Sequence, residues 1–249
     1  MRVKSISPVS WCLALALGGL CLAGASPAAA QAITLDIPQG GGLTGRALQL
    51  VALITVLSLA PSILVMMTSF TRIVIVLSLL RTAMGVQQSP PNSVIISLAL
   101  FLTAFVMAPV LQKSWEDGIK PLMDEQIELS EAFDKASKPV HGFMLKYVRE
   151  KDLALFIELS KTEKPATPQE VKLQVLIPAF MISELRRAFE IGFLLFVPFI
   201  VIDLVVASVL MSMGMMMLPP IIISLPFKLI FFVLVDGWHL VAGSLIKSF

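Results

Sequence analysis

The side chains that could carry out chemistry are few, and they form no catalytic set. His141 and His239 lie far apart in the sequence, and neither belongs to a cluster with the spacing of metal ligands. Both cysteines, Cys12 and Cys21, fall in an N-terminal segment that we expect to be removed. The sequence therefore favours a protein that is not an enzyme and that needs no cofactor and no metal.

Charged side chains within apolar segments are more informative, because a charge in lipid is costly and is usually paired. Glu184 and Arg187 have i,i+3 spacing, which predicts a pair on one helix. Arg186 and Glu190 have i,i+4 spacing and predict a second pair. Asp203 has no such neighbour, so we expect its partner on another helix or subunit. A place at the bilayer edge, with the charge reaching water, is the alternative. The other members of this class are Arg72, Arg81, Lys228 and Asp236.

Methionine is the second unusual residue type, with 13 in the chain. Five of them crowd the stretch before the double proline at 219–220: Met211, Met213, Met215, Met216 and Met217. Since methionine is flexible, a ring of such side chains from several subunits could close on itself and adapt to a passing polypeptide. Filling gaps between helices is the more common use of methionine, and composition alone favours it.

The composition is that of a membrane protein, with 57% hydrophobic residues, 14% charged residues and a mean hydropathy of +0.88. A net charge of +2 gives no electrostatic reason to expect nucleic acid as a partner. No alternating strand pattern occurs. The sequence predicts an all-α membrane protein built from helical hairpins.

The first 30 residues predict a cleavable signal peptide. Basic residues precede an apolar run, and three alanines ending at Ala30 form a small-residue cleavage site. We expect cleavage between Ala30 and Gln31. An uncleaved first membrane span is the alternative, but the run is shorter than the roughly 20 residues that cross a bilayer. A Gly-rich tether follows at residues 31–46.

The charges divide the remaining chain into three segments. Residues 113–176 contain 22 of the 36 charged residues (19 basic plus 17 acidic) and predict a mostly helical segment. Residues 47–112 and 177–249 each predict a hydrophobic hairpin of two crossings, which makes nominally four transmembrane segments. With an exported N-terminus, four crossings place the charged segment in the periplasm and the protein in the bacterial inner membrane. Apolar residues at helical spacing from 143 to 159 predict one amphipathic helix.

Two long strings resemble the signatures of a known family. Residues 178–192, PAFMISELRRAFEIG, are similar to the first signature of the flagellar biosynthetic protein FliP family. Residues 198–215, beginning PFIVID, resemble the second. Strings near Pro61, Arg72 and Pro90 are also similar, so the resemblance covers about residues 43–249.

This resemblance implies a core subunit of the type III export gate in the flagellar basal body. It implies a ring-like or helical homo-oligomer, a pentamer in the family, with FliQ, FliR, FlhB and FlhA as further partners and unfolded flagellar proteins as substrates. It assigns Met215, Met216 and Met217 to the gasket of a closed pore. It also implies that apolar segments face other subunits, that charges such as Asp203 pair between subunits, and that prolines break the segments into hairpins. Those prolines are Pro61, Pro90, Pro91, Pro109, Pro198, Pro219, Pro220 and Pro226.

Three alternatives remain open. The homologous subunit of a virulence injectisome shares the C-terminal signatures, although a cleavable signal favours the flagellar branch. A small-solute or ion transporter could use Asp203 and Asp236 as ion sites, but the sequence shows no repeat symmetry. A membrane enzyme would need a catalytic set, and we identify none.

Overall fold

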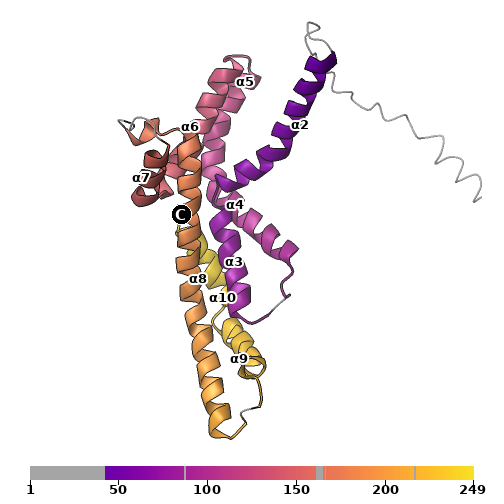
Figure 1. The fold of residues 1–249 in the computed structure, drawn as a ribbon, viewed down its shortest axis with the longest axis vertical. Helices are drawn as coiled ribbons and strands as arrows, with labels where there is room; N and C mark the ends of the chain where they lie inside the picture. Colours follow the sequence, from indigo (N-terminus) through magenta and orange to yellow (C-terminus); the bar gives the residue numbers. More distant parts are fainter. Residues whose placement is uncertain (1–42, 87, 161–164, 166, 216) are drawn as a thin grey trace, which may run out of the picture. The chain divides into compact units, whose positions relative to one another are not determined.

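The computed structural model describes residues 43–86, 88–160, 165, 167–215 and 217–249, and within these it contains helices and no strand. The chain divides into two units, Met1–Leu53 and Ile54–Phe249. The first contributes the beginning of α2, and the second contains every other helix (Figure 1). The predicted all-α class is confirmed for the described residues. The predicted signal peptide lies outside them, and so does most of the predicted tether, whose last residues begin α2.

The first half of the described chain forms α2 (Leu43–Met66), α3 (Phe70–Ala83) and α4 (Asn92–Ser114). A π-helical turn, η1 (Trp115–Ile119), continues α4 directly into the short α5 (Lys120–Met123). The second half forms α6 (Leu129–Tyr147), α7 (Glu150–Leu159), a 3-10 turn η2 (Pro168–Glu170), α8 (Leu173–Ser212), α9 (Pro220–Leu234) and α10 (Gly237–Lys247). The stretch predicted as one N-terminal hairpin thus contains three helices.

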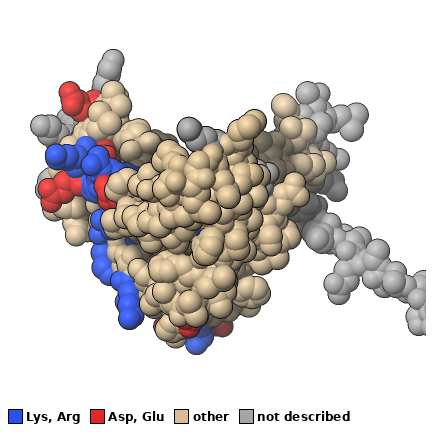
Figure 2. All heavy atoms as spheres, turned by 90° about the horizontal axis from the view of Figure 1, so that it is seen from below, with Lys and Arg blue, Asp and Glu red and all other residues tan. Residues whose placement is uncertain are grey.

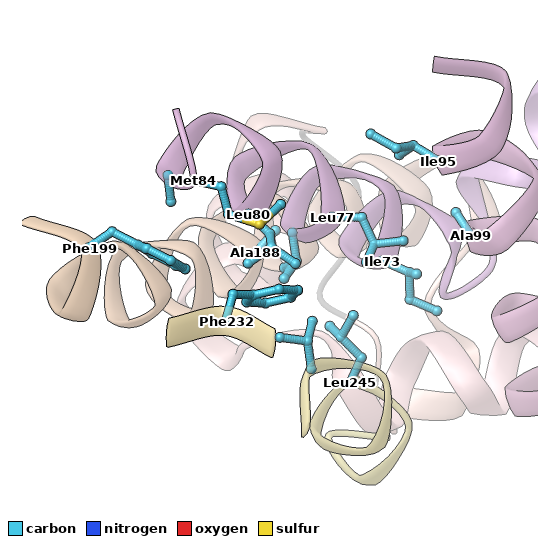
Figure 3. Close-up of a cluster of buried hydrophobic side chains, with 13 residues drawn as sticks. Ile73, Leu77, Leu80, Met84, Ile95, Ala99, Ala188, Phe199, Phe232 and Leu245 are labelled. Atoms are coloured by element: carbon cyan, nitrogen blue, oxygen red, sulfur yellow. The ribbon is translucent and has the colours of Figure 1, made fainter. Parts of the chain in front are cut away.

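The main core forms where α3 packs against α8 and α4. Apolar residues on α3 recur at i, i+3, i+4 and i+7, as in Ile73, Val76, Leu77 and Leu80, and all are buried. Figure 3 shows Ile73, Leu77 and Leu80 in one cluster with Ala188 of α8, Phe232 of α9 and Leu245 of α10. A close approach of α3 to α8 needs Gly192, because a Cβ there would lie within 3.3 Å of both Cβ and Cγ of Leu79.

A second core joins the charged segment to α4 and α8. Met144 on α6 is fully buried with Met107 from α4 and Phe180 from α8. The π-helical turn packs against α6 at Gly118, where a Cβ would come within 2.6 Å of the backbone nitrogen of Ala136. The charged segment is therefore packed onto the apolar helices.

The single amphipathic helix predicted from residue 143 to 159 is wrong, because the structure divides it into α6 and α7. Val148 and Arg149 are extended between the two helices. The break is held by α8: the Arg149 backbone N–H donates to Ser183 Oγ at 3.0 Å, and Ser183 Oγ donates to Asp152 Oδ2 at 2.7 Å. The spacing of apolar residues along one helix cannot predict a contact between residues more than 30 positions apart.

The prolines do not all break helices as the family resemblance suggested. Those at 90–91 and 219–220 stand at chain reversals, but Pro109, Pro198 and Pro226 lie inside α4, α8 and α9, and position 61 lies within α2. An internal proline removes one backbone hydrogen bond, which a long apolar helix packed in protein or lipid tolerates.

Two helices are long and apolar enough to cross a membrane, the continuous helix Asn92–Met123 and α8. The pair α9–α10, bent by 63°, would make a third span if it crosses as a unit. The first predicted crossing, at residues 47–71, meets only a shorter apolar stretch, Leu50–Leu59. The described residues thus offer two or three crossings where the sequence predicted four.

The second unit exposes much apolar surface. Phe101 on α4 and Phe193, Leu194 and Leu204 on α8 are all at least 65% exposed. The end that contains the α8–α9 turn has wide uncharged areas, with charged residues gathered along one edge (Figure 2). Surface of this kind is normally covered by lipid or by another protein. Since α8 has 40 residues, it is about 60 Å long, roughly twice the hydrocarbon thickness of a bilayer.

Candidate functional site

A buried ion pair between Arg72 and Glu184 joins α3 to α8. Arg72 from α3 donates from Nε to Glu184 Oε2 at 2.8 Å and from Nη2 to Oε1 at 2.5 Å. The two side chains are 1% and 0% exposed. This bidentate geometry satisfies both carboxylate oxygens and neutralises both charges away from water. The pair therefore fixes α3 against α8.

The end of α10 completes this pair. Arg72 Nη1 donates to the backbone oxygen and to Oγ of Ser248, both at 3.0 Å. The ring of Phe249 lies 3.7 Å from Arg72 Cζ, in the geometry of a cation–π contact. Arg72 thereby connects three helices: α3, α8 and α10.

A second, partly buried pair lies further along α8. Lys228 Nζ on α9 is 2.7 Å from Asp203 Oδ2 on α8, and it also approaches the Ala83 oxygen at the end of α3 at 3.5 Å. Ser224 donates to the other carboxylate oxygen of Asp203 at 2.5 Å. Lys228 is buried, whereas the side chain of Asp203 keeps 31% of its surface exposed. Asp203 thus has a partner on another helix of the same chain.

The methionine-rich stretch forms the turn between α8 and α9. Gly214 has φ +75°, and the backbone N–H groups of Gly214 and Met215 donate to the oxygens of Met211 and Leu210. This is a Schellman motif, which ends α8, and Pro219–Pro220 starts α9. The described methionines before the prolines are exposed, from 42% for Met215 to 98% for Met217. Position 216 lies outside the described residues.

Of the two charge pairs predicted on one helix, the structure replaces one and keeps the other. Glu184 bonds to Arg72 and not to its i,i+3 neighbour Arg187, because the buried guanidinium offers two hydrogen bonds. Arg186 and Glu190 do pair, at 2.9 Å on an exposed face. Asp236 is exposed and has φ 50° at the bend between α9 and α10.

Two further positions complete the predicted set. Arg81 Nη1 donates to Asn92 Oδ1 at 2.6 Å and ties the end of α3 to the start of α4. The predicted cleavage site at Ala30 and Gln31 lies outside the described residues. Within the described chain no group of three or more His, Cys, Asp or Glu residues could hold a metal ion.

Comparison with known proteins decides the family. The model of the FliP family matches residues 53–245, which is most of the chain. The chain belongs to the FliP family. It is 70% identical to the flagellar biosynthetic protein FliP of Caulobacter vibrioides over 226 residues, which cover 90% of this chain and 85% of the relative. The protein of the same name from Bacillus subtilis is 57% identical over 81% of this chain and 91% of its own. That of Aquifex aeolicus is 49% identical over 86% of this chain and 91% of its own.

Membership of the FliP family confirms the resemblance noted in the sequence. The first signature string lies on α8 and contains Glu184, which pairs with Arg72. The second begins on α8, continues into the turn that follows it, and contains Asp203, which pairs with Lys228. The signatures of the FliP family thus contain one partner of each buried pair.

Sequence reasoning missed several residues of this site. Ser248 and Phe249, which close the Arg72 pair, have no charge and no motif to mark them. Asp152 belongs to none of the predicted charge pairs, yet it accepts from Ser183 on α8. In the sequence these residues are marked only by position: Ser248 and Phe249 follow the last apolar segment, and Asp152 lies just after the break between α6 and α7.

Proposed function

We propose that this chain is a core subunit of the flagellar type III protein export gate, which forms a polypeptide-conducting pore in the bacterial inner membrane with further copies of itself. The observation that carries the proposal is the family match over residues 53–245, with relatives that are named flagellar biosynthetic proteins. In this proposal FliQ, FliR, FlhB and FlhA are its partners, and unfolded flagellar proteins are its substrates.

The methionine loop supports a place for the gate. Met215 and Met217 are exposed at a turn that contacts little else in the chain, so their side chains are available to neighbouring copies and to a passing polypeptide. The Schellman motif at Gly214 ends α8 before this stretch, and Pro219 precedes α9 after it, so the flexible side chains stand between two fixed helix ends. A gasket needs this combination of a fixed base and adaptable side chains.

The ion pair that joins α8 to α9 supports the same assignment. Asp203, Ser224 and Lys228 join α8 to α9, and Lys228 also reaches the end of α3. These contacts fix the hairpin that presents the loop. The exposed apolar faces of α4 and α8 give further copies and other subunits a surface to cover.

Complementation tests the proposal. The gene is expressed in a strain of its own species that lacks the chromosomal copy, and motility and secretion of filament protein are scored. We expect both to be restored by the full chain and neither by a chain that lacks residues 213–217. Unimpaired motility in the strain without the gene would overturn the proposal. Loss of virulence-protein secretion with normal motility would assign the chain to an injectisome.

A further inference from the structure

A groove of about 580 Å³ lies between α4, α6 and the end of α10, and the buried ion pairs do not account for it. One wall is apolar and comes from α4. The floor is aromatic and comes from α6 and α10. The wall residues are Phe105, Val106, Pro109 and Val110, and the floor residues are Phe143, Tyr147 and Phe249.

The floor of the groove is preformed. Phe249 stacks on Phe143 with ring centroids 6.1 Å apart and meets Tyr147 edge-on at 5.4 Å. Arg72 also holds this cluster, since its Cζ lies over the Phe249 ring at 3.7 Å from the centroid. An apolar ligand would therefore find the floor in place and would lose little free energy in ordering it.

Two exposed lysines line the same groove, Lys113 from α4 and Lys146 from α6. In the described part of the chain neither has a carboxylate within ion-pair distance, and Lys146 Nζ donates only to the Tyr147 hydroxyl, at 2.8 Å. The nearby carboxylate of Glu116 accepts from Gln112. The groove thus combines apolar surface with two unpaired positive charges.

The position of the groove along α4 indicates what covers it. This helix belongs to the continuous helix Asn92–Met123, which is apolar enough to cross a membrane. No charge occurs from residue 82 to 112, and Lys113 is the first, followed by the exposed Trp115. Lysine and tryptophan at the end of an apolar span mark the level of lipid headgroups.

We propose that this groove binds an anionic phospholipid, with an acyl chain along the apolar wall and aromatic floor and the headgroup phosphate between Lys113 and Lys146. A helix of a partner protein would cover the apolar wall equally well, but an apolar helix would bury both lysines without a counter-charge, which is costly. A lipid phosphate supplies that charge from the end of the apolar span, where Lys113 stands, within the groove that Lys146 also lines.

Binding is measured on the full chain in detergent by native mass spectrometry. The probes are a short-chain phosphatidylglycerol, a phosphatidylcholine with the same chains, and inorganic phosphate. We expect saturable binding of phosphatidylglycerol, much weaker binding of phosphatidylcholine, and no binding of phosphate alone. Removing both charges in K113Q/K146Q should weaken phosphatidylglycerol binding about 30-fold. The matched variant K120Q/K138Q removes one lysine from the same two helical segments outside the groove and should bind as wild type.

A second variant tests the groove itself and keeps both lysines. Gly142 lines the groove, and a Cβ there would meet no atom within 4 Å, so Gly142→Leu fills the space without a clash at the backbone. We expect this variant to keep its melting temperature and to lose phosphatidylglycerol binding. Gly243→Leu, at a glycine that is equally open but outside the groove, is its control.

Three results would overturn the proposal. The first is equal binding of the two lipids with no effect of K113Q/K146Q, which would make the groove an apolar surface for a protein partner. The second is binding of inorganic phosphate as strong as that of the lipid. The third is full lipid binding by a folded Gly142→Leu variant.

Discussion

Arg72 and Glu184 are 112 positions apart in the chain, yet they share two hydrogen bonds in a site closed to solvent. Both side chains are buried, so water solvates neither charge. Their pairing makes α3 and α8 depend on each other, and it places the first family signature at the centre of the fold. Removing one partner should therefore cost more stability than replacing both partners with apolar side chains.

The first prediction concerns the stability lost when only one partner is removed. Arg72→Met should destabilise the chain by about 3–5 kcal/mol, because it leaves the Glu184 carboxylate buried and unpaired. For a chain of this size that corresponds to a melting temperature lowered by about 10 °C. The measurement is thermal unfolding of the full chain in detergent.

The double variant R72M/E184M provides the test of mechanism. It removes both charges and should recover most of the lost stability, since a buried pair can be replaced by apolar side chains of similar volume. Arg186→Gln breaks an exposed pair and should change stability by less than about 1 kcal/mol. A single variant no less stable than Arg186→Gln would contradict this account.

The second prediction concerns the pair between Asp203 on α8 and Lys228 on α9. Asp203→Asn should be more harmful than Lys228→Met, because the first leaves a buried ammonium unpaired and the second leaves a carboxylate that is 31% exposed. Combining the two substitutions should restore stability. Melting temperatures of the three variants measure the order, and the reverse order would show that the partial exposure of Asp203 does not solvate it.

The third prediction concerns the approach of α3 to α8. Gly192→Val should lower stability by about 1–3 kcal/mol, because the added carbons would meet Leu79. Gly243→Ala, at an open helical glycine, should raise stability by up to about 1 kcal/mol through helix propensity. Thermal unfolding separates the two, and a stabilising Gly192→Val would mean that the helices can move apart at no cost.

The sequence predicted the helical class and the positions where charges matter, since both depend on local residue type. It did not predict the partner of Glu184, because helical spacing sees only neighbours such as Arg187, while Arg72 comes from another helix. For the same reason it merged α6 with α7, whose break is held by Ser183 on α8. Local pattern finds elements and charged positions, and tertiary contacts decide partners and breaks.

Helix α8 is longer than the prolines in its sequence would predict. Pro198 was expected to interrupt this segment, yet the helix continues through it and also through Pro178. Its packing against α3, α7 and α9 supplies enough stabilisation to tolerate the lost backbone hydrogen bonds. Proline alone therefore did not predict where this helix ends.

The fourth prediction concerns maturation. The bond between Ala30 and Gln31 should be cut in the cell, because a basic start, an apolar run and small residues precede it. N-terminal sequencing of the membrane-extracted protein should begin at Gln31. Ala30→Arg should block the cut and leave a longer chain on a gel, whereas a wild-type protein that begins at Met1 would rule out the signal.

The last prediction rests on the proposed gate. Replacing Met215, Met216 and Met217 with alanine should let small solutes leak through the assembled complex, because alanine cannot reach across a pore that long, flexible side chains close. Leakage is measured as entry of a small polar dye into cells that express the variant. Met211→Ala serves as control, since this residue is exposed but lies on α8 before the turn. Leakage equal to that of wild type in the triple variant, with normal assembly, would remove the loop from the gate and leave the exposed methionines of the α8–α9 turn without a role in closure.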